Sequence, residues 1–255
     1  MKDRSAWTRL ALVVVVALVL ALLLAAPAFA KKGNRGNPRV LPPHSSAYGM
    51  TYGDWGATWW QWALAIPAAT NPLNDEFGDY AAEGQSGPVW FLGGTVNFTP
   101  VPGEDYAYEG VAERTCSVPA GKALFFPIVN VEASTAEGNG ETVEELTTLC
   151  DFYVTHTTEL SATIDGRAVA NLFAYRGTSG GYPLWWPDDD ALFGLPPLDE
   201  PTLSVSDGYW LLLPPLPPGP HELHWAGKQE FSLAADGFDA IFSQDITYHL
   251  TVVGS

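Results

Sequence analysis

Basic residues are scarce in this chain of 255 residues, which has 12 Lys and Arg against 29 Asp and Glu. Seven of the 12 lie before residue 40, and the remaining five are Arg114, Lys122, Arg167, Arg176 and Lys228. A body this acidic repels phosphate backbones, so nucleic acid is excluded as a partner. Solubility is the simplest reason for the acidity, with a saline habitat or bound divalent cations as alternatives. We expect most of the five isolated bases to pair with carboxylates of the same chain.

Cysteine is also nearly absent, because Cys116 and Cys150 are the only two in the chain. The lack of a closely spaced cysteine pair argues against a structural zinc site built from them. In an oxidising compartment neither thiol has another partner, so we predict a Cys116–Cys150 disulfide; two buried thiols are the alternative. Closing a loop of this length would stabilise the fold by about 3–4 kcal/mol.

The first 30 residues have the three parts of a secretory signal peptide. Bases precede residue 10, residues 11–26 are uninterrupted and apolar, and residues 28–30 end the segment with a small-x-small motif. We therefore predict cleavage after Ala30 and an exported protein that is secreted, periplasmic or held at the cell surface. An uncleaved anchor is the alternative, because the apolar run is near the lower limit for spanning a bilayer. Only in that case would the chain contact a membrane.

The residues after the signal suffice for one sizeable core. Residues 31–47 are rich in Lys, Gly, Asn and Pro without apolar periodicity, which predicts a flexible leader. The rest folds, because hydrophobic residues make up 47% of the chain and it includes 10 Trp, 10 Tyr and 12 Phe. No internal repeat is visible, so we predict one β-rich domain over residues 48–255.

Helical periodicity occurs in only two places. Trp55, Trp59 and Trp62 recur at helical spacing after Asp54, a good N-cap, which predicts a helix over about 54–65. A second apolar face predicts a helix over about 142–157, which places Cys150 on a helix.

Short apolar stretches punctuated by Pro and Gly make up the remainder, as is typical of β structure. Asp165-Gly166 is the strongest hairpin signal, and apolar residues alternate with polar ones over residues 245–253, which predicts a strand with one buried face. Further strands are expected in residues 87–98, 122–131, 159–164, 167–176, 209–213 and 222–226. The predicted fold is mainly β, a β-sandwich or jelly-roll-like fold with two ancillary helices.

Several blocks resemble a family of uncharacterised secreted bacterial proteins. They are WGATWWQWALAIPAATNP (55–72), GQSGPVWFLGG (84–94), RTCSVPAGKALFFPIVN (114–130), DGYWLLLPPLPPGPHELHWAGK (207–228) and DITYHLTV (245–252). The resemblance spans nearly the whole mature chain and implies export and a shared fold. It assigns no catalytic residue, because the family has no settled function.

Residues 177–181 fit the G-x-S-x-G pattern of a hydrolase nucleophile elbow around Ser179, with Asp207 and His249 downstream in the hydrolase order. An elbow needs a helix after the serine, and Pro183 and Pro187 follow here instead. An ordinary Gly-rich loop fits the pattern better.

No metal or cofactor site is predicted from His221 and His224, because residues three apart on a strand point to opposite faces. Asp188, Asp189 and Asp190 offer oxygen ligands that could hold Ca²⁺ in a loop, but a solvated acidic turn fits them better. Carboxylates are so abundant that no pair is selected for glycoside hydrolysis.

Tryptophan clustering is the most unusual feature of the sequence. A short helix with Trp on several faces can bury only some of them in one core, which leaves Trp60 for a ligand. Trp185 and Trp186 lie in a Pro-rich segment, where we expect a surface loop and at least partial exposure. The leading hypothesis is an exported, non-catalytic binding or surface-associated module that meets a carbohydrate or a protein through exposed aromatics. A secreted hydrolase with unidentified catalytic residues and a structural envelope protein are the alternatives.

Overall fold

The computed structural model describes residues 38–254, and the predicted signal peptide lies outside this range. No helix within residues 38–254 is long and apolar enough to cross a membrane. The second half of the predicted leader lies inside the range and contacts the core. The backbone N–H of Leu41 donates to the carbonyl of Leu212, and the Tyr52 hydroxyl donates to the carbonyl of Leu41. Whether residues 31–47 are flexible remains a prediction.

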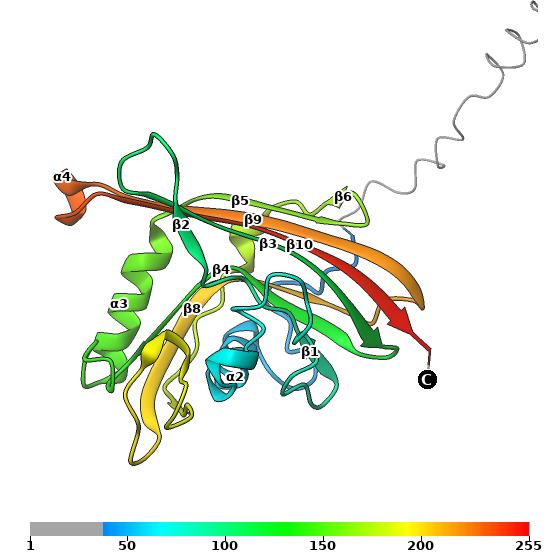
Figure 1. Cartoon of the computed structure of the whole chain (residues 1–255), viewed down its shortest axis with the longest axis horizontal. Helices are drawn as coiled ribbons and strands as arrows, with labels where there is room; N and C mark the ends of the chain where they lie inside the picture. Colours follow the sequence, from blue (N-terminus) through cyan, green and yellow to red (C-terminus); the bar gives the residue numbers. More distant parts are fainter. Residues whose placement is uncertain (1–37, 255) are drawn as a thin grey trace, which may run out of the picture. The chain divides into compact units, whose positions relative to one another are not determined.

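The fold is mainly β and sandwich-like, with two sheets and few helices, as the sequence predicts (Figure 1). The large sheet has the order β2-β3-β10-β9-β5-β6. Its strands are β2 (Phe98–Pro100), β3 (Ala107–Pro119), β5 (Thr157–Ile164), β6 (Arg167–Ala168), β9 (Gly219–Phe231) and β10 (Ala240–Val253). The small sheet has the order β1-β4-β8-β7. Its strands are β1 (Val89–Phe91), β4 (Ala123–Ser134), β7 (Tyr182–Leu184) and β8 (Thr202–Leu213).

Both predicted helices are confirmed, as α2 (Tyr52–Ala65) and α3 (Val143–Thr155). The N-cap of α2 is Thr51 rather than Asp54. The Asp54 carboxylate instead accepts a hydrogen bond from the Thr51 backbone N–H, which completes a capping box and stabilises the first turn of the helix. The structure adds one turn, α4 (Leu233–Asp236), and three 3₁₀ segments, η1 (Ala68–Thr70), η2 (Leu172–Tyr175) and η3 (Leu192–Gly194).

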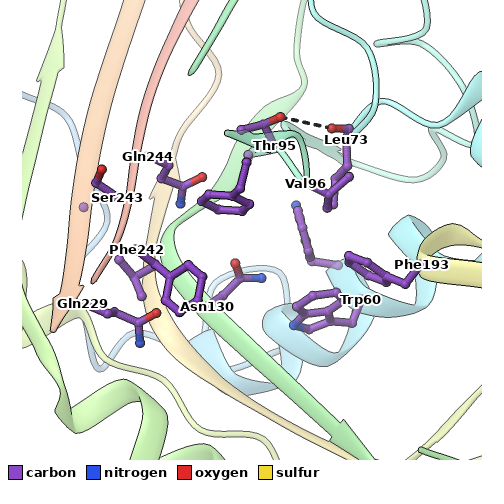
Figure 2. Close-up of a pocket in the computed structure, with 15 residues that line it drawn as sticks. Trp60, Leu73, Thr95, Val96, Asn130, Phe193, Gln229, Phe242, Ser243 and Gln244 are labelled. Atoms are coloured by element: carbon purple, nitrogen blue, oxygen red, sulfur yellow. Dashed lines mark hydrogen bonds between the residues drawn. The ribbon is translucent and has the colours of Figure 1, made fainter. Parts of the chain in front are cut away.

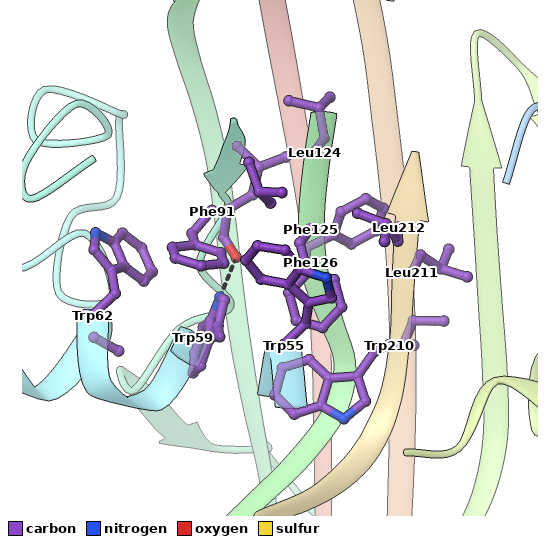
Figure 3. Close-up of a cluster of buried hydrophobic side chains, with 14 of the residues drawn as sticks. Trp55, Trp59, Trp62, Phe91, Leu124, Phe125, Phe126, Trp210, Leu211 and Leu212 are labelled. Carbon is purple, nitrogen blue, oxygen red and sulfur yellow. Dashed lines mark hydrogen bonds between the residues drawn. The ribbon is translucent and has the colours of Figure 1, made fainter. Parts of the chain in front are cut away.

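The small sheet is buried on both faces, which explains the continuous apolar runs in β4 and β8. On one face, Phe125 stacks on Trp210 with ring centroids 5.1 Å apart, and α2 covers them with Trp55 and Trp59 (Figure 3). On the other face, Phe126 stacks on Trp225 of the large sheet at 4.5 Å. Two adjacent residues of β4 thus join the helix layer and the large sheet to a common core.

The predicted disulfide is wrong, because both cysteines are free. Cys150 on α3 packs with Leu146 and Val205 in a separate small cluster, and its thiol points to the Val205 carbonyl. Cys116 lies on β3, against the main core. The two cysteines therefore belong to different packing clusters, and burial raises the pKa of each thiol to about 12.

Candidate ligand-binding cleft

The inner face of the large sheet continues beyond the small sheet, and strand register sets which residues form this extension. Two rows of cross-strand neighbours cross it. The first row is Phe98, Gly110, Gln244 and Gly227, and the second is Pro100, Tyr108, Phe242 and Gln229. Because directly paired residues point to the same face of a sheet, each row presents its side chains together.

A pocket of about 170 Å³ lies where this extension meets the small sheet. Figure 2 shows its walls: Gln229, Phe242 and Gln244 from the large sheet face Trp60, Asn130 and Phe193. The segment of residues 94–96 closes a third side.

Two glycines in the lining, Gly94 and Gly227, allow the pocket walls to pack closely against their neighbours. A Cβ on Gly227 would lie 2.4 Å from Cγ2 of Val129, and one on Gly94 would lie 2.6 Å from Oε1 of Gln244. Neither position can accept a side chain without a shift of its neighbour. The shape of the pocket therefore depends on Gly94 and Gly227, although neither has a side chain.

The pocket is uncharged, since none of its 15 lining residues is Asp, Glu, His, Lys or Arg. The lack of charged side chains in the lining is notable in a chain with 29 acidic residues. General acid and base catalysis needs a titratable side chain within reach of the substrate. The lining provides none, and it favours a neutral ligand.

The polar side chains of the pocket carry indole, amide and hydroxyl groups, and the indole and amide groups provide its buried donors. Nε1 of Trp60 and Nδ2 of Asn130 are buried donors with no partner among the described residues. By contrast, Nε1 of the adjacent Trp59 donates to the Leu92 carbonyl at 3.0 Å. The amide nitrogens of Gln229 and Gln244 donate to the carbonyls of Tyr153 and Ile128, both at 2.6 Å, which leaves their amide oxygens as acceptors.

Beside the pocket lies an aromatic shelf, which we define as Phe98, Tyr108 and Phe242. Tyr108 stacks on Phe242 at 5.5 Å, and Phe98 meets the same ring edge-on at 6.1 Å. The three side chains are 40%, 37% and 37% exposed. Phe98 and Phe242 also line the pocket, so shelf and pocket form one continuous cleft.

The structure separates the three tryptophans expected to meet a ligand. Trp60 lines the pocket, and whether it meets a ligand stays a prediction. The expectation that α2 buries only some of its tryptophans is wrong, because all four are buried in the main core. Trp185 is 41% exposed but is not among the lining residues.

The expected exposure of Trp186 is wrong, because this side chain is fully buried and donates to the Pro196 carbonyl. The neighbouring prolines do not exclude a strand here: β7 lies at the edge of the small sheet, where Pro is tolerated, and residues 182, 184 and 186 point inward.

The hydrolase-like pattern around Ser179 has a structural explanation. The Ser179 hydroxyl accepts from the backbone N–H of Ser206, and the Asp207 carboxylate is held by Arg176. His249 lies 2.9 Å from Glu113 on the large sheet. Each member of the supposed triad thus has a different partner.

The two histidine candidates and Asp190, one of the three aspartate candidates, have local partners. His221 contacts Asp165, and His224 contacts Asp245, both at 2.9 Å. A carboxylate oxygen of Asp190 accepts from the backbone N–H of Ala69 and ties its turn to η1. No group of three or more His, Cys, Asp or Glu side chains within residues 38–254 is placed to hold a metal ion.

Four of the five isolated bases divide into two kinds. Arg176 pairs with Asp207 and Asp151, and Lys228 pairs with Glu159 and Glu230, as expected. Arg114 is instead buried on backbone carbonyls and the Tyr248 hydroxyl, and Lys122 donates to the Gly87 carbonyl.

One titratable cluster escaped the sequence reasoning. Glu132 on β4 accepts from the Ser204 hydroxyl, while Ser134 donates to nearby Glu137. Burial, followed by repulsion from Glu137, raises the pKa of the Glu132 carboxyl to about 9. Glu132 does not line the pocket.

The amides and the shelf were missed as well, although a signal for two of these residues exists. Phe242 and Gln244 continue the alternation of Ile246 and Tyr248, so a longer predicted strand would have placed them on the inner face. Asn130 carries no such signal, because its position depends on how the two sheets pack.

Comparison with known proteins adds little. No family model and no curated protein matches this sequence. One solved structure, described as "Structure of PbICP-C in complex with falcipain-2", is 11% identical and matches 64% of this chain and 98% of its own chain, with a TM-score of 0.20. A likeness this weak carries no argument. The resemblance to uncharacterised secreted bacterial proteins remains a prediction.

Proposed function

We propose that this protein is an exported, non-catalytic binding module that takes a neutral ligand in the cleft between its sheets. The uncharged lining of the pocket, in a strongly acidic chain, is the observation that supports this most. Apolar walls with a few fixed polar groups are typical of small-molecule sites. Export itself rests on the signal pattern of residues 1–30.

The same observation disfavours the hydrolase alternative at this site. Hydrolysis needs an acid or a base beside the scissile bond, and the lining has none: its hydroxyls, on Thr95 and Ser243, have no titratable side chain beside them in the lining to activate them. Ser179, the serine that fits a hydrolase pattern, is buried, and its hydroxyl binds a backbone amide.

Binding of small ring fragments tests the proposal. We expect neutral rings such as phenol and cyclohexane-1,2-diol to shift the indole N–H resonance of Trp60 in ¹H–¹⁵N spectra, because they enter the pocket that Trp60 lines. Loss of this resonance in Trp60→Phe identifies it. Benzoate and benzylamine, of similar size but charged, should leave it in place. A pocket that takes the charged rings and rejects the neutral ones would contradict the proposal.

A further inference from the structure

The pocket has room for one six-membered ring. Its volume is about 170 Å³, and cavities of about 150 Å³ hold benzene. A ligand of one ring would leave the adjoining shelf of Phe98, Tyr108 and Phe242 exposed to water. A ligand with a second ring would cover it, since Phe98 and Phe242 border both regions.

The polar groups of the pocket require a ligand that both accepts and donates. Trp60 and Asn130 have buried N–H groups without a partner among the described residues, while Gln229 and Gln244 keep amide oxygens as acceptors. A hydroxyl group can accept from the N–H groups and donate to the amide oxygens. An aliphatic or phenyl side chain of a peptide serves neither and would leave the buried polar groups unpaired, which is unfavourable.

The aromatic groups require flat apolar faces on the same ligand. The shelf adds three rings to the ring of Phe193, which is 58% exposed at the opposite wall. Sugars combine a ring with a C–H face, several hydroxyls and no charge, and they are thus complementary to every wall of the cleft.

We propose that the ligand is a neutral oligosaccharide, with one sugar ring in the pocket and the adjoining ring on the shelf. This deepens the proposed function and rests on it. The pocket ring exchanges hydroxyl hydrogen bonds with Trp60, Asn130 and the two glutamines. The second ring packs on Tyr108 and Phe242.

Calorimetric titration of the exported protein with sugars of increasing length tests this proposal. The probes are the methyl monosaccharide and the di-, tri- and tetrasaccharides of glucose, mannose, xylose and N-acetylglucosamine. For at least one series we expect affinity to rise about tenfold from one ring to two or three, and then to level off. The plateau follows from the limited extent of the shelf.

Two variants separate the pocket from the shelf. Tyr108→Ala removes a shelf ring that does not line the pocket, so the gain with length should disappear while monosaccharide affinity stays within twofold. Tyr80→Ala, of the same residue type and 39% exposed away from the cleft, is its control and should change nothing. Trp60→Phe should weaken every length alike, by about fivefold to tenfold.

The outcomes distinguish this proposal from the one it rests on. If neutral fragments enter the pocket but no sugar series gains affinity with length, the oligosaccharide is excluded and the binding module stands. If N-acetyltyrosinamide or short tyrosine peptides bind and sugars do not, the ligand is a protein instead. If the fragments also fail to bind, both proposals are overturned.

Discussion

Trp59 and Trp60 are neighbours in one helix, and they differ in whether the indole N–H has a hydrogen-bond partner. Both side chains are buried, with ring centroids 5.1 Å apart. Among residues 38–254, the Trp59 indole N–H has a partner, the carbonyl of Leu92 (Figure 3), and that of Trp60 has none. The Trp60 N–H is buried without a partner, and under the proposed function the ligand would supply one.

Trp59→Phe and Trp60→Phe form a matched pair that tests whether the Trp60 N–H lacks a partner in the fold. Each deletes the same atoms, but only Trp59→Phe leaves the Leu92 carbonyl without its donor, so it should lower the free energy of unfolding by about 1–3 kcal/mol more than Trp60→Phe. Denaturant unfolding of the two variants measures the difference. Equal losses, or a larger loss for Trp60→Phe, would show that the Trp60 N–H has a stabilising partner in the fold.

Trp185 and Trp186 give a second contrast between neighbours, and here the sequence expectation was only half right. Trp186 is fully buried, whereas Trp185 is partly exposed. We expect Trp186→Ala to destabilise the protein by about 3–5 kcal/mol, as large-to-small core changes do. Trp185→Ala should cost about 1 kcal/mol or less. Thermal unfolding of both variants checks this, and similar losses from the two would contradict the burial assignment.

At the scale of elements, α2 is unusual because it contains Gly53 and Gly56, which weaken an isolated helix by about 1 kcal/mol each. Packing explains both. A Cβ on Gly53 would lie 2.1 Å from the Thr178 carbonyl oxygen, and one on Gly56 would lie 2.9 Å from the Trp210 ring. The two glycines lower the helix propensity of α2, but they allow it to pack closely against the small sheet and the Gly-rich loop.

Helix propensity alone predicts that Gly53→Ala stabilises the protein, and the packing of Gly53 predicts the opposite. Gly53→Ala should destabilise the protein by about 1–3 kcal/mol, because the clash is with backbone that cannot rotate away. Thr58→Ala, on the same helix and half-buried, is the control and should be neutral or slightly stabilising. Equilibrium unfolding decides between the two effects. A more stable Gly53→Ala protein would mean that the loop of residues 177–181 does not press on α2 in solution.

How far the elements could be predicted depends on what their inward positions carry. The tryptophan spacing of α2 and the Asp165-Gly166 turn of the β5–β6 hairpin gave clear signals. Strand β3 was not predicted, because its inward positions hold Gly110, Ala112 and Arg114, which produce no apolar alternation. Strand β8 begins before its predicted start, since its buried N-terminal half includes serines.

At the scale of the whole molecule, sequence reasoning reaches the fold class but not the site. The sheets depend on two parallel pairings, β1 with β4 and β3 with β10, and β3 and β10 are far apart in the chain. The cleft forms only once these pairings extend the large sheet past β4. Local patterns carry no information about such pairings, so Trp60 could be suspected while Asn130 and Gln229 could not.

The buried carboxyl of Glu132 makes the stability of the whole molecule depend on pH. Its pKa rises from an ordinary value of 4.5 to about 9 through burial and the nearby Glu137. The folded protein therefore keeps a proton that the unfolded chain releases above about pH 4.5. The associated stability is complete below that pH and is lost as pH rises through about 9.

We predict that Glu132→Gln removes this loss. The amide keeps an oxygen that can accept from the Ser204 hydroxyl but it cannot ionise. Between pH 5 and pH 9 the variant should gain stability over the parent by at least about 1.4 kcal/mol, the equivalent of one pKa unit. Denaturant unfolding across this range at constant ionic strength gives both curves, and Glu104→Gln, at an exposed loop position, should run parallel to the parent. Parallel curves for Glu132→Gln as well would mean that Glu132 ionises as freely in the folded protein as in the unfolded chain, and that the cluster between β4, β8 and α3 is open to water.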